Sequence, residues 1–321
     1  MRMLVSGVAG MIFSHFADMA LAKGHQVIGL DGMFEGSSLN NLLTFDTNPN
    51  FKMIYSPVEH LQLKQFFGDL PDIIIQGAAF SNVDTSISAP SLFNRNYLAT
   101  SRMLELAREL SIPIILVGSD EEYGSWSNNQ ALVDEYSNGW AGFNEGARLN
   151  PSSAYSASKA ASSLLGLSYF KTFNVDCRVT RCSNNFGTRQ QDKFIPTMLK
   201  KLWLGEKVPI FKTPAERDWL HVSDHCEAIF TVINRGEPGE IYNISANDEK
   251  SPYAVLETFV GYDKAPELVE WVEPRLGYDT RYFCDSSKVR RLGWEPTKSL
   301  AGSIDELTEW YFKAFSSGYF N

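Results

Sequence analysis

The sequence of 321 residues is poor in cysteine, has no excess of positive charge and has no long apolar run. The spacing of its four cysteines fits neither a metal site nor a disulfide framework, so we expect no metal and reduced, buried thiols in a cytoplasmic protein. They are Cys177, Cys182, Cys226 and Cys284. The formal net charge of −9 argues against a nucleic-acid or anionic-membrane partner, because both are usually held by basic surfaces. No stretch reaches the length of a membrane span, and the apolar start breaks at Gly7, which predicts a strand rather than a signal peptide.

Apolar segments of strand length alternate with helical segments through the first two thirds of the chain, as in MRMLVSG, SHFADMALAKG and HQVIGLD. Such alternation is typical of a parallel sheet with helices on both faces. After about residue 190 the elements become shorter. We therefore predict an α/β fold, with a Rossmann-type doubly wound parallel sheet over residues 1–190 and a smaller C-terminal substrate-binding α/β lobe over residues 191–321. A strand and a helix around residues 215–245 are expected to return to the sheet.

A glycine-rich turn, GVAGMIF over residues 7–13, follows the first predicted strand and leads into a helix. Glycines at such a turn let the backbone approach a pyrophosphate, which then sits on the helix N-terminus. Asp31 ends the second strand, where a carboxylate binds the adenosine ribose diol and repels the 2′-phosphate of NADP, so the pattern favours NAD as cofactor. The alternative is a plain turn in which Asp31 only ends a strand. Phe13 stands where the fingerprint has its third glycine, which predicts a shift in helix packing or a side chain that points elsewhere.

Two further patterns carry acid–base chemistry. Tyr155 and Lys159 are four residues apart in a predicted helix, so the ammonium lies near the phenol and lowers its pKa. Ser119, Asp120 and Glu121 follow a buried strand, at the sheet edge where ligands bind, and offer a hydroxyl, an acid and a base. The alternatives are a surface Tyr–Lys pair and a solvated acidic loop.

Several motifs in order resemble one family. The segment from Ser119 to Gly124 is similar to its Thr-Asp-Glu-Val-Tyr-Gly, and the segment from Pro151 to Lys159 is similar to its Pro-x-x-x-Tyr-Ser-x-Ser-Lys. Residues 77–87, 182–187, 216–225, 240–245 and 277–282 also match. On these motifs, which run from about residue 3 to about residue 312, the chain resembles the dTDP-glucose 4,6-dehydratase family of the extended short-chain dehydrogenase/reductases.

The resemblance implies NAD-dependent conversion of a nucleoside-diphosphate hexose to its 4-keto-6-deoxy product. Tyr155 is then expected to take the proton of the sugar 4-hydroxyl, with Lys159 tuning Tyr155 and Ser119 bonding the 4-oxygen. Glu121 is expected to remove the C5 proton, and Asp120 to protonate the departing 6-hydroxyl. A homodimer is also expected, through helices around residues 91–110 and 153–172.

The resemblance also implies which residues contact each ligand. The cofactor set is Gly7, Gly10, Met11, Ile12, Asp31, Ala78, Ala79, Tyr155 and Lys159. The substrate set is Ser81, Asn184, Asn185, Lys193, Arg217, Asn243 and Arg281. Arginine suits bidentate binding of phosphate, although any one of these side chains can equally serve as a surface ion pair or a loop brace.

The chain departs from the family pattern at several positions. Pro57 and Val58 stand where the family often has an aspartate and an apolar residue that bind adenine, Phe80 replaces a polar residue, and the loop 212–215 lacks the usual glycines. The nucleoside and the sugar of the substrate therefore stay open. So do a 4-epimerase, a sugar-acid decarboxylase, a 5,6-dehydratase and a nucleotide-binding regulator without turnover, although the pair of Asp120 and Glu121 favours elimination of water.

Overall fold

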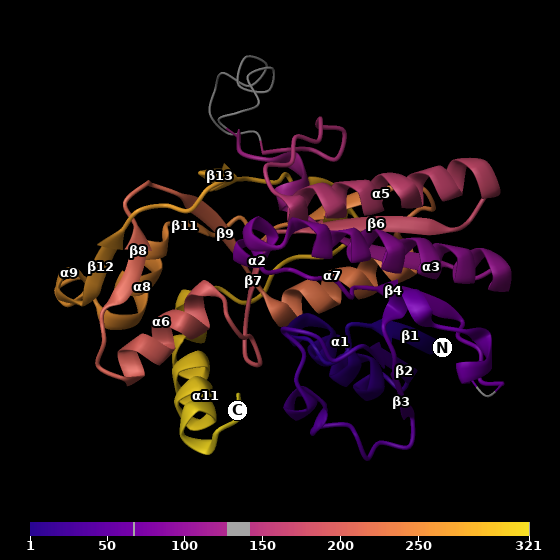
Figure 1. The fold of residues 1–321 in the computed structure, drawn as a ribbon, viewed down its shortest axis with the longest axis horizontal. Helices are drawn as coiled ribbons and strands as arrows, with labels where there is room; N and C mark the ends of the chain where they lie inside the picture. The colour runs from indigo at the N-terminus through magenta and orange to yellow at the C-terminus, as the bar shows by residue number, and fades with distance from the viewer. Residues whose placement is uncertain (67, 127–141, 321) are drawn as a thin grey trace.

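The computed structural model describes residues 1–66, 68–126 and 142–320, and the ribbon in Figure 1 has a larger and a smaller part. Within these ranges, seven parallel strands form the sheet of the larger part, in the order β10-β6-β5-β4-β1-β2-β3. They are β1 (Arg2–Ser6), β2 (Gln26–Asp31), β3 (Phe51–Tyr55), β4 (Ile73–Gln76), β5 (Ile114–Ser119), β6 (Cys177–Cys182) and β10 (Ile241–Ile244). The order reverses between β1 and β4, and ligands bind at the carboxyl ends of the strands at such a point.

Helices cover both faces of this sheet. Successive residues of a strand point to opposite faces, so Met3 and Val5 of β1 enter the core under α1 and α7, whereas Leu4 enters the core under α3 and α5. The helices of this part are α1 (Met11–Ala22), α2 (Val83–Ser88), α3 (Asn94–Leu110), α5 (Ala154–Phe173) and α7 (Val222–Arg235). Short 3-10 helices are η1 (Leu39–Leu42), η2 (Val58–His60), η3 (Leu63–Phe66), η4 (Pro90–Phe93) and η5 (Asp120–Tyr123).

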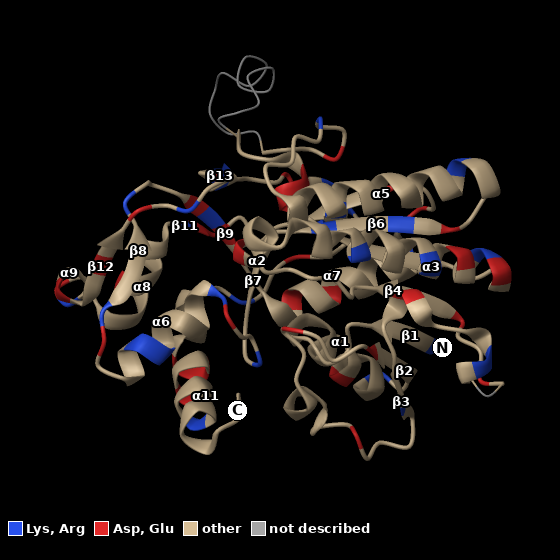
Figure 2. Ribbon diagram, viewed as in Figure 1, with Lys and Arg blue, Asp and Glu red and all other residues tan. Residues whose placement is uncertain are grey.

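The smaller part has its own buried core and two small sheets, one with the order β11-β9-β13 and with β7 beside β9, the other formed by β8 and β12. Its strands are β7 (Asn184–Phe186), β8 (Val208–Phe211), β9 (Glu216–His221), β11 (Glu249–Lys250), β12 (Val269–Val272) and β13 (Arg281–Tyr282). The remaining helices are α6 (Phe194–Trp203), α8 (Pro252–Val260), α9 (Ala265–Leu268), α10 (Ser287–Arg291), η7 (Ala301–Ser303) and α11 (Ile304–Ser317). Charged residues of both signs meet along β9 and β11 (Figure 2).

The predicted Rossmann-type α/β fold is confirmed. The division at residue 190 stays a prediction. Two elements that follow this residue in the chain lie in the larger part, where α7 packs on α1 and β10 pairs with β6. None of the helices in the described ranges has the length and apolar character needed to cross a membrane. The four cysteines are free and buried.

Candidate active site

A cleft among the described residues opens at the switch point of the sheet, beside the turn after β1. Its unfilled space of ≈ 1260 Å³, part of it open to solvent, suffices for a dinucleotide. Every residue of the predicted cofactor set lines it: Gly7, Gly10, Met11, Ile12, Asp31, Ala78, Ala79, Tyr155 and Lys159. The structure thus brings together residues that lie more than a hundred positions apart in the sequence.

The glycine turn fits a pyrophosphate. Gly7 has a φ of +75°, and a Cβ there would lie 3.0 Å from the Cα of Ala78, so a side chain would be strained and crowded. The N-cap of α1 is Gly10, which supplies no side-chain acceptor. The first N–H groups of α1 therefore face the cleft without a side chain competing for them, and a helix N-terminus in this state favours an anion.

Asp31 is held in one orientation at the end of β2. Its carboxylate accepts hydrogen bonds from the backbone N–H of Ala9 at 3.0 Å and of Met33 at 2.8 Å, and from the hydroxyl of Ser37 at 2.9 Å. The carboxylate lines the cleft, so a buried acceptor with a fixed position is available to a ribose diol. These residues fit the adenosine half of NAD.

Phe13 causes no misfit in the turn, because the sequence makes room for it elsewhere. The ring is 5% exposed and packs in the core beneath α1. A Cβ on Gly77, just after β4, would overlap the ring of Phe13. The glycine that the turn lacks is thus compensated by Gly77, which lets α1 stay close to the sheet. Our sequence reasoning missed this residue, although its place directly after an apolar strand was a visible signal.

The catalytic candidates of the acidic loop lie at the carboxyl end of β5, beyond the inner end of the cleft. Ser119 is the N-cap of η5, and its hydroxyl accepts from the N–H of Glu121 at 3.3 Å and donates to Asp120 at 3.3 Å. Oε1 of Glu122 in turn accepts from the N–H of Ser119 at 3.0 Å, which completes a capping box. This box fixes the backbone that carries the two neighbouring carboxylates.

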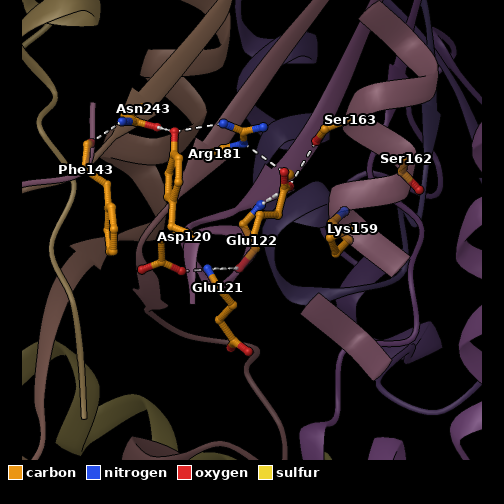
Figure 3. A network of polar contacts seen from close by, with 12 residues as sticks. Asp120, Glu121, Glu122, Phe143, Lys159, Ser162, Ser163, Arg181 and Asn243 are labelled. Atoms are coloured by element: carbon orange, nitrogen blue, oxygen red, sulfur yellow. Dashed lines mark hydrogen bonds and ion pairs between the residues drawn. The ribbon is translucent and has the colours of Figure 1, made fainter. Parts of the chain in front are cut away.

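Glu122 anchors the loop to the sheet through a buried network (Figure 3). Its carboxylate accepts from Nε of Arg181 at 2.8 Å and from the hydroxyl of Ser163 at 3.0 Å. Arg181 also donates to the hydroxyl of Tyr123 at 2.8 Å. A Cβ on Gly118 would collide with Oε1 of Glu122, so glycine is needed there. Figure 3 shows Glu122 turned toward Arg181 and Ser163, whereas Glu121 points away.

Tyr155 and Lys159 lie in the first turns of α5, whose N-terminus is fixed by a capping box between Ser153 and Ser156. The Lys159 amine donates to the carbonyl of Val117 on β5, which holds the side chain between helix and sheet. Burial raises the pKa of Tyr155 well above its usual value, and the charges of Glu121 and Asp120 add to the rise, while the Ser119 hydroxyl opposes it. Burial lowers the pKa of Lys159, and Glu122 opposes this change. The prediction that Lys159 lowers the pKa of this phenol is therefore wrong for this structure, in which burial and the two carboxyls raise that pKa.

Asp120 and Glu121 have different charge environments. Burial raises the pKa of Asp120 well above its usual value, and the charge of Glu121 adds to the rise. Its Oδ2 is buried and has no hydrogen-bond partner among the described residues. Burial also raises the pKa of Glu121, but Lys193, Arg217 and Arg275 all act to lower it. Asp120 therefore tends to hold a proton, and Glu121 is the carboxyl more easily ionised by its neighbours.

The predicted substrate residues divide into two groups. Lys193 and Ser81 line the cleft, and the Lys193 amine donates to the Ser81 carbonyl at 2.7 Å. Oδ1 of Asn184 is buried and has no partner in the described ranges, so it is available to a ligand. Arg217, in contrast, is already engaged within the protein, because it donates to the backbone carbonyls of Glu216, Asp279 and Thr280.

Three more side chains are likewise engaged within the protein. Asn185 bonds the ring of His225 and the carbonyl of Ser183. Arg281 forms a two-point ion pair with Glu249, at 2.9 and 2.6 Å. Asn243 is 0% exposed and accepts from the hydroxyl of Tyr123. In this structure these three side chains serve as braces.

Arg275 is a site residue that the sequence reasoning missed. Its Nη1 is buried and lacks a partner among the described residues, and its guanidinium is close enough to Glu121 and Lys193 to shift the pKa of each. Its one ion pair in the described ranges is with Asp84 at 3.4 Å. Its place two residues before the matched segment 277–282 was the available signal.

A doubly wound sheet with a glycine turn, an acid ending β2 and a Tyr155–Lys159 pair on the helix after β5 defines the extended short-chain dehydrogenase/reductase class. A family profile described as GDP-mannose 4,6 dehydratase matches residues 4–307, and the chain belongs to this family. The resemblance found in the sequence is therefore confirmed.

Individual relatives agree with this assignment. The chain is 35% identical to a dTDP-glucose 4,6-dehydratase of Actinoplanes sp. over 325 residues, covering 97% of this chain and 98% of the relative. It is 32% identical to a dTDP-glucose 4,6-dehydratase of Xanthomonas campestris, covering 96% and 92%. A crystal structure of the dTDP-glucose 4,6-dehydratase of Streptomyces venezuelae, which holds NAD, is 32% identical and covers 99% and 98%, with a TM-score of 0.89.

Proposed function

We propose that the protein is an NAD-dependent dehydratase that converts a nucleoside-diphosphate hexose to the 4-keto-6-deoxy sugar. One observation carries the proposal: two adjacent carboxyls, the buried Asp120 and the half-buried Glu121, have different charge environments and both raise the pKa of the Tyr155 phenol. An oxidation alone needs only the phenol. Loss of water across C5 and C6 needs in addition a base for C5 and an acid for the 6-hydroxyl, and this loop supplies both.

The first step needs a base for the sugar 4-hydroxyl. When bound, NAD would supply the redox chemistry, as acceptor of the C4 hydride and then as its donor to C6, where it and a solvent proton at C5 saturate the C5–C6 double bond. Tyr155 takes the hydroxyl proton, Ser119 bonds the same oxygen, and the Lys159 cation stabilises the phenolate that forms. Burial and the two carboxyls oppose formation of this anion, because they raise the pKa of the phenol.

Elimination then uses the acidic loop. Glu121 removes the C5 proton, which the neighbouring carbonyl at C4 makes acidic. Asp120, which holds a proton because of its burial, protonates the 6-hydroxyl so that water leaves. The capping box and the Glu122 contacts keep both carboxyls fixed while this happens.

Cations on the side of the smaller part anchor the substrate diphosphate. Lys193 and Arg275 bring two positive charges near Glu121, and Arg275 has a buried donor without a partner among the described residues. We assign the diphosphate to these two residues, with Asn184 as a further polar contact, rather than to Arg281, which Glu249 already engages.

A homodimer formed by α3 and α5 is part of the proposal. The two helices pack on each other and carry exposed apolar side chains, among them Tyr97, Leu98 and Leu164. A second copy is a partner that covers such a face by symmetry. Light scattering at micromolar concentration tests it, and a monomer there would contradict it. The cytoplasm stays the predicted compartment, and the free, buried cysteines agree with it.

The decisive experiment is to incubate the purified protein with a panel of nucleoside-diphosphate hexoses in deuterium oxide and to weigh the products. A dehydratase yields a product that has lost one water and has gained deuterium. A product of unchanged mass with inverted C4 would indicate an epimerase and would overturn the proposal.

A further inference from the structure

Four side chains from separate elements meet at the end of the cofactor cleft near Asp31. Phe34 comes from the loop after β2, Glu59 from η2, Phe80 from the loop after β4 and Arg95 from the first turn of α3. All four line the cleft together with Asp31. Since Asp31 is the proposed ribose acceptor, this cluster lies at the adenosine end.

Arg95 is at the centre of the cluster. Its Cζ lies 4.3 Å from the centre of the Phe34 ring and 5.3 Å from that of Phe80, and the two ring centres are 5.5 Å apart. Nε and Nη2 both contact Oε1 of Glu59, at 2.6 and 2.5 Å. The rings thus support the guanidinium, and Glu59 fixes it from the edge.

One part of this guanidinium is left for a ligand. Within the described part of the chain, Glu59 is the only residue that accepts a hydrogen bond from Arg95, so Nη1 keeps its donors. The side chain is 29% exposed, which means that the charge is only partly hydrated. A partly desolvated guanidinium gains more from stacking on an aromatic ring than an exposed one does.

The surroundings match a flat, weakly polar heterocycle. Val58, Ala78 and Ala99 give this end of the cleft apolar walls. Pro57, directly before η2, offers neither a backbone N–H nor a polar side chain. Adenine has an aromatic face and ring nitrogens that accept hydrogen bonds. Arg95 offers its planar guanidinium to the face and its Nη1 donors to the ring nitrogens.

We propose that Arg95 binds the adenine of the cofactor, stacking its guanidinium on the ring, with Phe34 and Phe80 as its support and Glu59 as the residue that orients it. Phe34, Glu59 and Phe80 act as positioning residues for Arg95. The proposal rests on the cofactor assigned above but not on the reaction. It makes adenosine binding in this protein depend on a cation–aromatic cluster built from two loops, the 3-10 helix η2 and the α-helix α3.

The test is titration calorimetry on nucleotide-free protein, with AMP and nicotinamide mononucleotide as separate ligands. Arg95→Met keeps the side-chain stem and removes the guanidinium, so we expect AMP to bind about 10-fold more weakly. Nicotinamide mononucleotide is expected to bind as in the wild type. Arg102→Met is the matched control, because Arg102 lies on the same helix but donates to the carbonyl of Leu61 and does not line the cleft.

Arg95→Lys separates stacking from charge. Lysine keeps the charge but not the planar group, so we expect AMP to stay weakly bound. Full recovery by lysine would mean a contact with phosphate and would overturn the proposal. Unchanged or tighter AMP binding in Arg95→Met would also overturn it, because the guanidinium would then be a bystander or an obstruction.

Phe34→Leu guards against misfolding of the Arg95 variants. Phe34 lies on a loop and is 39% exposed, so its replacement leaves the core intact, and we expect AMP binding to weaken about threefold. Unaltered AMP binding in this variant would contradict a supporting role for the ring. This test does not depend on turnover. If the Arg95 variants lose AMP binding but the wild type makes no product from any sugar nucleotide, the proposed function is overturned and this inference stands.

Discussion

Glu122 and Arg181 form an ion pair at 2.8 Å in which the side chains are 0% and 2% exposed, respectively. A buried pair of this kind stays favourable only while both partners are present and the remaining polar atoms are satisfied. Ser119, Ser163 and Tyr123 satisfy them here. The pair thus ties the backbone of the catalytic loop to β6.

Removing one partner of the Glu122–Arg181 pair is expected to destabilise the protein. Arg181→Met leaves the Glu122 charge buried without its partner, which should lower the free energy of unfolding by about 3–5 kcal/mol in urea titrations. Glu122→Gln keeps an acceptor for the Ser119 N–H and should reduce kcat roughly 10–100-fold by loosening the loop, with KM little changed. Asp176→Asn, which breaks the ion pair with Arg178 instead, is the control.

The pH profile separates a positioning role of Glu122 from a purely structural one. The Glu122 carboxylate opposes the lowering of the Lys159 pKa, so its neutralisation lets that pKa fall further. The limb of the rate profile that reports Lys159 should move to lower pH in Glu122→Gln. An unshifted profile with reduced stability would assign Glu122 to the fold alone.

Tyr155→Phe removes the proposed base and leaves the aromatic ring. We expect the rate to fall by about 10²–10⁴-fold, since a general base typically contributes that much. A single-turnover experiment should show no reduced cofactor by absorbance, because oxidation at C4 is the first step. Accumulation of reduced cofactor in this variant would assign the base to another residue.

Variants of the two carboxyls of the acidic loop should stop the reaction at different steps. Glu121→Gln is expected to permit oxidation but not removal of the C5 proton, so a 4-keto hexose that retains its water should accumulate. Asp120→Asn should also stall before water leaves, yet exchange the C5 hydrogen with deuterium oxide, because Glu121 is intact. Proton NMR of C5 distinguishes the two, and wild-type turnover of Glu121→Gln would mean that Glu121 is not the base for C5.

Asp120 should also make stability depend on pH. Its pKa is raised in the folded protein, so ionisation favours the unfolded state, and stability from this group is present below the usual pKa of 3.8 and is lost as pH rises through the raised value. The amide introduced by Asp120→Asn cannot ionise. The melting temperature of this variant minus that of the wild type should therefore increase with pH. A melting-temperature difference that stays constant from acid to alkaline pH would refute the raised pKa of Asp120.

Phe13 and Gly77 should be coupled energetically. Gly77→Ala places a methyl group where the Phe13 ring lies, which should cost about 1–3 kcal/mol and weaken NAD binding. In Phe13→Gly together with Gly77→Ala, the added methyl group no longer meets a ring. The double variant should therefore be more stable than the sum of the two single effects predicts, as measured in a urea double-mutant cycle. Additive effects would mean that the two residues do not share this space.

The sequence by itself determined the order of strands and helices, the glycine turn, Asp31 and the Tyr155–Lys159 spacing. These features are local: apolar runs, turn glycines and a four-residue helical repeat lie in short windows, and a parallel sheet follows from their alternation. Its motifs were also sufficient for the family. The match of Phe13 with Gly77 and the pairing of Glu122 with Arg181 were not readable, because each joins residues about 60 positions apart that only the sheet brings together.

Only the tertiary structure decided which polar side chains remain available to a ligand. Arg281 and Asn243 carry the same donors as Arg275 and Asn184, and the sequence pointed to Arg281, Asn243 and Asn184 but not to Arg275. In the folded chain, Glu249 and Tyr123 use the first two, whereas Arg275 and Asn184 each keep a buried atom without a partner in the described ranges. A side chain's chemistry is set by its residue type, but its availability depends on every neighbour that folding brings within hydrogen-bond distance.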